Sequence, residues 1–86
     1  MPNYTLARIP PTEVDVDAIV LSGGTAVELG ADVRGKARWR FGYRGAFLEL
    51  TFEPRRALTL PLAEGASPSM KRLVDILTNA ELLKRA

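Results

Sequence analysis

The stretch ARWRFGYRGAFLELTF, residues 37–52, carries the clearest structural signal of this chain. From residue 38 to residue 43, basic or small residues alternate with aromatic ones, and a period of two is typical of a strand that buries one face. Arg44-Gly45 fits a two-residue turn. The alternation resumes after that turn, so the sequence predicts a β-hairpin.

The turn also determines which residues of the two strands face each other. One face then pairs apolar residues throughout: Tyr43 with Ala46, Phe41 with Leu48, Trp39 with Leu50 and Ala37 with Phe52. The opposite face pairs Gly42 with Phe47, Arg40 with Glu49 and Arg38 with Thr51. A slip of one residue would move the aromatic side chains of the first strand into water. We therefore predict this register, with Trp39, Phe41 and Tyr43 in the core.

Three other stretches have the composition of strands. Residues 4–9 and residues 25–29 are short runs of β-prone residues. Leucines occupy every second position from 58 to 62 and predict a further strand of the meander. Pro61 has no N–H for a sheet ladder, so we expect this strand to end at an edge.

The C-terminal part of the chain predicts a helix that begins at Ser67-Pro68, because serine is a favoured N-cap and proline a favoured first helical residue. Its apolar stripe consists of Met70, Leu73, Val74, Leu77 and Ala80. Further apolar residues make the stripe wider than one sheet would cover. We therefore predict that these residues contact a partner: Ile76, Leu82 and Leu83.

Two shorter stretches leave alternatives open. Thr12 and Asp15 fit a capping box, which favours a helix near residues 12–22, whereas apolar residues at alternate positions from 14 to 20 would fit a strand. We favour the helix. A second capping box in the C-terminal helix suggests that this helix breaks near Asn79.

Together these elements predict an α+β fold. We expect an antiparallel β-meander of about four strands packed against the C-terminal α-helix, with a short helix near residues 12–22. At 86 residues, 47% of them hydrophobic, the chain has the size and composition of one globular domain. Residues 1–86 are therefore expected to form a single small domain.

The composition argues against catalysis and against metal or cofactor binding. The chain contains no cysteine and no histidine, which removes thiolate chemistry and the side chain best suited to proton transfer near neutral pH. No nucleophile is spaced with a base that could activate it. We expect no enzyme activity, no catalytic residue, no cofactor and no small-molecule substrate.

Two motifs bear on the same question. Glu13, Asp15 and Asp17 could line up as metal ligands on a strand, but no glycine-containing calcium loop surrounds them, and we expect no metal site. Residues 30–36 have the spacing of a phosphate-binding loop. Ala37 stands where such a loop needs a hydroxyl, and the next residues predict a strand rather than a helix. We therefore expect no nucleotide site.

The N-terminal residues lack the basic start and apolar run of a secretory signal. No apolar stretch approaches the roughly 20 residues that span a bilayer. The expected location is the cytoplasm, without contact to a membrane.

The charges are divided unevenly along the chain. Residues 1–33 carry one basic and five acidic residues, whereas residues 34–56 carry seven basic and two acidic residues. Such a chain can offer an anionic and a cationic patch to one partner or to copies of itself. The sequence thus predicts a small non-enzymatic protein-protein interaction module, a regulator, adaptor or subunit of a larger assembly. It would contact a protein partner or a second copy through the C-terminal helix and the basic sheet face.

The alternative is a nucleic-acid-binding domain that uses the arginine-rich face of the hairpin. Rows of basic residues favour phosphate backbones, and Phe47 on the same face could stack on a base. We favour instead that Phe47 lies beneath the N-terminal segment or residues 12–21, because a small domain seldom leaves a phenylalanine exposed. The residues of this alternative site are Arg34, Lys36, Arg38, Arg40, Arg44 and Phe47.

Overall fold

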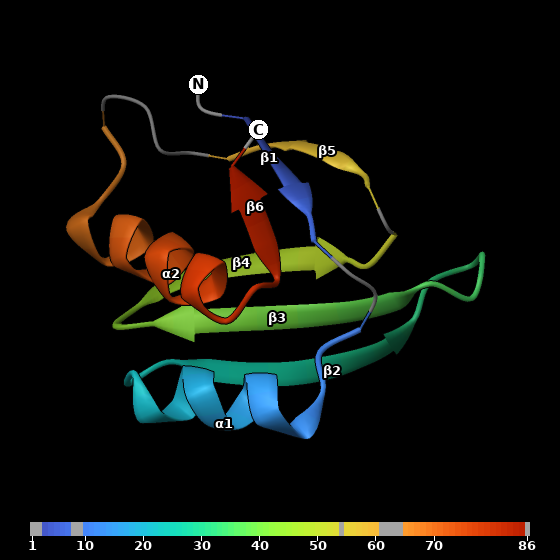
Figure 1. The fold of residues 1–86 in the computed structure, drawn as a ribbon, viewed down its shortest axis with the longest axis horizontal. Helices are drawn as coiled ribbons and strands as arrows, with labels where there is room; N and C mark the ends of the chain where they lie inside the picture. The colour runs from blue at the N-terminus through green and yellow to red at the C-terminus, as the bar shows by residue number, and fades with distance from the viewer. Residues whose placement is uncertain (1–2, 8–9, 54, 61–64, 86) are drawn as a thin grey trace.

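The computed structural model describes residues 3–7, 10–53, 55–60 and 65–85. Within these ranges the chain forms two helices and six strands, and the strands form two antiparallel sheets of three. The predicted α+β class is confirmed (Figure 1). In chain order the elements are β1 (Asn3–Leu6), α1 (Glu13–Leu21), β2 (Thr25–Ala31), β3 (Ala37–Tyr43), β4 (Ala46–Thr51), β5 (Ala57–Thr59), α2 (Pro68–Asn79) and β6 (Leu83–Arg85).

The larger sheet has the order β2-β3-β4 and contains the predicted hairpin. Arg44 and Gly45 have φ values of 45° and 86°, the left-handed conformation that a two-residue hairpin turn requires at both positions. The register is the predicted one, from Tyr43 opposite Ala46 to Arg38 opposite Thr51. Both the position of this hairpin and the two faces of its strands are therefore as predicted.

The smaller sheet joins the two ends of the chain, with the order β5-β1-β6. Thr5 of β1 lies opposite Ala57 of β5 on one side and opposite Lys84 of β6 on the other. The strand predicted to continue the meander thus does not pair with β4. Its described part, β5, pairs with β1 instead, because the chain leaves the larger sheet after β4 and crosses to the second sheet; Leu62 lies outside the described residues.

The helix expected near residues 12–22 is confirmed as α1, and its capping box is formed. The backbone N–H of Thr12 donates to Oδ2 of Asp15 at 2.8 Å, and the N–H of Asp15 donates to Oγ1 of Thr12 at 3.4 Å. These bonds satisfy two amides at a helix start that would otherwise lack acceptors. The local capping signal therefore outweighed the alternating pattern that would have fitted a strand.

The C-terminal helix begins as expected, since Oγ of Ser67 accepts a hydrogen bond from the N–H of Met70 at 3.1 Å. It ends at Asn79, where the sequence suggested a break. Glu81 has a φ of 62°, a left-handed conformation that redirects the chain. The chain then enters a strand, β6, and not a second helical piece, because residues from Leu83 onward complete the ladder of β1.

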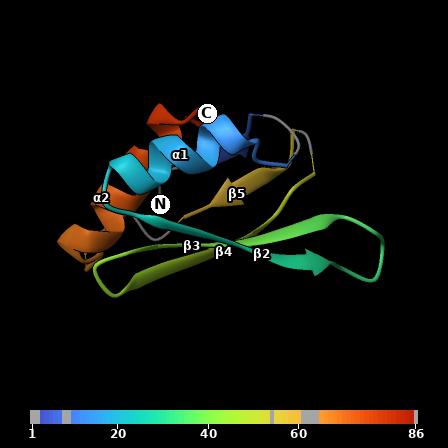
Figure 2. The ribbon, with the colours of Figure 1, turned by 90° about the horizontal axis from the view of Figure 1, so that it is seen from below.

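The two sheets and the helices form layers around one core. Figure 2 shows the larger sheet as one layer, with both helices and β5 on the same side of it. The buried side chains come from both sheets and both helices: Tyr4, Leu6, Ile19, Phe41, Leu50, Phe52, Leu60, Leu73, Val74, Ile76, Leu77, Ala80, Leu82 and Leu83. The opposite face of the larger sheet is not covered by any described element.

Candidate interaction surfaces

The three residues predicted to contact a partner lie inside the core of the chain itself. Ile76, Leu82 and Leu83 are 2%, 0% and 2% exposed. Leu83 lies opposite Leu6 in the smaller sheet, and the N–H of Leu82 donates to the carbonyl of Leu77 at 3.0 Å. This burial corrects the expected contact surface. The wide apolar stripe is covered internally, because α2 and the segment after it meet two sheets where the sequence suggested one.

Half of the large apolar side chains that are exposed among the described residues lie on the other helix. Val14, Val20 and Leu21 of α1 are 75%, 57% and 87% exposed. Only one apolar side chain of this helix, Ile19, is buried. The sequence did contain a signal for this surface, because apolar residues lie on all sides of α1, and a surface helix can turn only one side toward a core.

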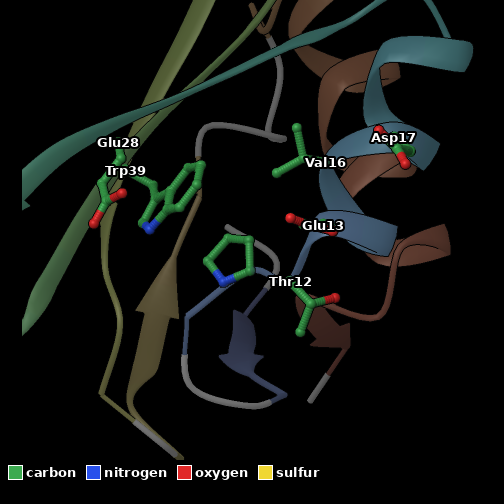
Figure 3. Close-up of a pocket in the computed structure, with 7 residues that line it drawn as sticks. Thr12, Glu13, Val16, Asp17, Glu28 and Trp39 are labelled. Atoms are coloured by element: carbon green, nitrogen blue, oxygen red, sulfur yellow. The ribbon is translucent and has the colours of Figure 1, made fainter.

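A groove runs between α1 and the larger sheet, with a volume of about 470 Å³. Its lining residues are Pro11, Thr12, Glu13, Val16, Asp17, Glu28 and Trp39. Glu28 and Trp39 lie side by side because they are opposite each other in the β2–β3 ladder. Figure 3 shows Val16 and Glu13 pointing from α1 toward the indole of Trp39 across this space. None of these residues was predicted as a contact residue, since only the fold brings residues 11–17 against β2 and β3.

The uncovered face of the larger sheet carries part of the predicted nucleic-acid site. Arg38, Arg40 and Phe47 share this face, as the register required. Nη2 of Arg40 lies 2.9 Å from Oε1 of Glu49 in an ion pair in which each side chain is about half exposed. The arginine row is therefore partly neutralised by the cross-strand glutamate.

Phe47 is 60% exposed and lies over Gly42 of the neighbouring strand. A Cβ atom at position 42 would lie 3.0 Å from Cε1 of Phe47 and 2.7 Å from Oγ1 of Thr25. The glycine thus leaves the space that the phenylalanine ring occupies, an arrangement known from aromatic residues that cover glycines in sheets. The ring is held against the sheet with its outer side open.

The remaining basic residues of that predicted site lie in the turns. Arg34 and Lys36 belong to the turn between β2 and β3, and Arg44 belongs to the turn between β3 and β4. The guanidinium carbon of Arg44 lies 5.5 Å from the centre of the Tyr43 ring. Because Tyr43 belongs to the core-facing side of β3, Arg44 leans away from the arginine row. The structure thus groups Arg38, Arg40 and Phe47, with the turn residues at the two ends.

The turn between β2 and β3 is organised by its own carboxylate. Oδ1 of Asp32 accepts hydrogen bonds from the N–H groups of Lys36 and Arg34, both at 2.8 Å. These two bonds, that of Lys36 first, hold the pKa of Asp32 below its usual value. Amides that a phosphate loop would offer to an anion are therefore occupied by Asp32, and the turn leads into a strand.

The three acidic residues near the start of α1 do not form a common site. Asp15 is buried in the capping box, while Glu13 and Asp17 are exposed. In the part of the chain that the structure describes, no group of three or more acidic side chains is close enough to hold a metal ion. Neither of the two helices seen in these residues has the length and apolar character needed to cross a bilayer. No protein-family model, curated protein or solved structure matches this chain.

Proposed function

We propose that this chain is a small protein-interaction domain that docks a protein partner through the exposed side of α1. One observation carries the proposal: Val14, Val20 and Leu21 each expose more than half of their side chains on a helix of nine residues. Single apolar residues on a surface are ordinary, whereas several on one short helix mark a contact surface.

The distribution of apolar surface supports this choice of helix. Among the described residues, six large apolar side chains are exposed, and three of them belong to α1. Burying one such side chain stabilises a complex by about 1.5–3 kcal/mol before the cost of association is subtracted. Three side chains on one helix therefore supply the centre of an interface, for a regulator, an adaptor or a subunit of an assembly.

The test isolates the tagged chain from the cells that produce it, comparing wild type with Val14→Asp and Val33→Asp. Val33 is the matched control, because it is a fully exposed valine that does not belong to α1. It lies in the turn between β2 and β3. We expect one protein to copurify in stoichiometric amount with wild type and with Val33→Asp, and to be lost with Val14→Asp. Rebinding of the purified partner to each variant, by calorimetry, must reproduce this order.

A stoichiometric partner that binds all three proteins equally would show that α1 is not the docking surface. Light scattering on the purified chain measures its molar mass and so tests whether it self-associates. A dimer that Val14→Asp dissociates and Val33→Asp leaves intact would identify the partner as a second copy.

A second function, nucleic-acid binding, is favoured by the environment of Phe47. Its exposed ring lies over Gly42, on the same uncovered face as Arg38 and Arg40. A base can stack on such a ring while neighbouring arginines contact phosphates, which is how sheet faces bind single strands. The Arg40–Glu49 ion pair weakens this candidate because it offsets one of the two charges.

Fluorescence anisotropy with a labelled single-stranded oligonucleotide tests this second function at low and moderate salt. The variant is Arg38→Glu with Arg40→Glu, and the matched control is Lys71→Glu with Arg72→Glu, the same change of charge on the exposed side of α2. Binding that falls steeply with salt and is lost in the first variant alone would establish it. Equal weakening of oligonucleotide binding by both variants would show that the interaction is only a non-specific attraction between charges.

A further inference from the structure

We propose that the groove between α1 and the larger sheet binds an arginine side chain on a basic segment of the protein partner. This inference rests on the proposed function, because it names the chemistry of the partner that α1 would dock. The groove adjoins the exposed side of α1, since Glu13, Val16 and Asp17 of that helix line it.

The floor of the groove suits an apolar stem. Trp39 lines it from β3, and Val16 faces the indole from α1 (Figure 3); Pro11, before α1, also lines the groove. Arginine combines a three-carbon stem with a planar cation that stacks on aromatic rings. The indole of Trp39 is the best aromatic surface for such stacking.

The rim of the groove determines the charge of the occupant. Glu13 and Asp17 lie on the α1 side, and Glu28 lies on the β2 side next to Trp39 (Figure 3). No lysine or arginine is among the described residues that line the groove. All three acidic residues are exposed, and none forms an ion pair or a side-chain hydrogen bond within the described part of the chain. A guanidinium stacked on Trp39 would lie in the field of these carboxylates, with Glu13 pointing toward the indole (Figure 3).

A second observation indicates that the groove lacks an interaction partner. Nε1 of Trp39 is buried and has no hydrogen-bond acceptor among the described residues. A buried indole N–H without an acceptor costs free energy, and such groups are rare in folded proteins. A backbone carbonyl of the bound segment would remove this cost after a small adjustment of the ring. The occupant is therefore a peptide segment, which brings a carbonyl as well as a cation.

The occupant is a segment of another protein rather than a second copy of this chain. The arginine row of the hairpin, Arg38 and Arg40, lies on the uncovered face of the larger sheet, whereas the groove lies on the face that α1 adjoins. A second copy docked by those arginines would join head to tail, and such contacts must either close into a ring or leave one free site at each end of an open assembly, so we take another protein as the occupant.

Trp39 is the only tryptophan of the chain, so its fluorescence reports on the groove alone. The probe is a blocked hexapeptide in which arginine alternates with valine, and the control peptide has glutamine in place of arginine. We expect the arginine peptide to shift and quench the emission in a saturable way that weakens with salt, and the glutamine peptide to have no effect.

The variant Glu13→Gln, Asp17→Asn, Glu28→Gln removes the three rim charges and should weaken binding about 8- to 27-fold, roughly two- to threefold for each charge. The matched control Glu53→Gln, Asp75→Asn, Glu81→Gln removes three exposed charges elsewhere and should bind like wild type. Glu28→Gln alone changes no residue of α1 and should weaken binding about two- to threefold. This single variant therefore controls for the possibility that the triple variant weakens binding by unfolding α1.

Saturable quenching that the rim variant loses and the control variant keeps supports the proposal. Equal binding of both peptides, or equal weakening by both triple variants, overturns it. Emission that changes with protein concentration in the absence of peptide, and only when the rim is intact, assigns the groove to a second copy and overturns the proposed occupant. Val14→Asp tests α1 docking separately, so a failed groove leaves the proposed function standing.

Discussion

The two helices of this chain differ in how many of their apolar side chains are buried. Helix α2 buries Leu73, Val74, Ile76 and Leu77 almost completely and turns charged residues to solvent. Helix α1 buries one apolar side chain, Ile19, and turns valines and a leucine to solvent. Figure 1 shows the reason in the arrangement: α2 lies over the larger sheet beside β6, whereas α1 runs along β2 at the edge of that sheet.

The surroundings of a helix, and not its apolar content, thus determine how much of it is buried. The apolar residues of α2 lie on one side, and neighbouring elements cover that side. The apolar residues of α1 are spread around the helix, and only the side that carries Ile19 meets the core. Apolar side chains on the outer side of a helix favour a contact with another molecule, which is why our proposal places the partner contact on α1.

The largest effect is expected for Leu77→Ala in α2. Leu77 is fully buried, so removal of its side chain leaves a cavity and should lower the free energy of unfolding by about 2–5 kcal/mol. The same change in α1, Leu21→Ala, should alter it by less than about 0.5 kcal/mol. Urea unfolding followed by circular dichroism measures both. Similar losses of unfolding free energy for the two variants would mean that the apolar residues of α1 are as buried as those of α2, which would contradict the difference between the helices.

The next effect is expected for Ile19→Ala. Ile19 is the one buried apolar side chain of α1, and its truncation should cost about 2–5 kcal/mol, less than Leu77→Ala because α1 has fewer buried neighbours than α2. Hydrogen exchange of the α1 amides should accelerate more than that of the α2 amides. Uniform acceleration in both helices would indicate that they unfold as one unit.

A smaller and similar effect is expected at the two helix starts. Thr12→Ala and Ser67→Ala each remove a side chain that accepts a hydrogen bond from a backbone amide, and each should cost about 0.5–2 kcal/mol. Urea unfolding again gives the values. Agreement between the two would show that the helices differ in burial but not in local stability, and a much larger loss at one of them would contradict that.

The smallest effect lies outside both helices, at Asp32. Its pKa is lowered in the folded chain, so the stabilisation is fully present above the ordinary pKa of an aspartate and is lost as pH falls below that value and through the folded pKa. Asp32→Asn should therefore be less stable than wild type at neutral pH, with the difference shrinking in acid. Carboxyl NMR titration should place the pKa below its usual range; an ordinary value would remove Asp32 as a cause of acid sensitivity.

Much of the larger sheet could be predicted because its signals are local. The alternation of residues 37–43, a turn that tolerates positive φ, and the resulting cross-strand pairs are all contained in one stretch. The caps at Thr12 and Ser67 are local in the same way. The register also placed Phe47 on the face opposite Trp39, Phe41 and Tyr43. Its 60% exposure did not follow from the sequence, which favoured a Phe47 covered by another part of the chain.

The burial of Ile76, Leu82 and Leu83 could not be predicted, because it depends on pairings between distant residues. Leu83 lies opposite Leu6 across almost the whole chain, and no local pattern indicates that β6 would cover the stripe of α2. The hairpin, the helix starts and the opposite charges of the two halves are properties of short stretches, and the sequence alone was enough for them. That Ile76, Leu82 and Leu83 are core and α1 is surface became visible only in the folded chain. Burial depends on which elements meet, and the second sheet forms only when the two ends of the chain come together.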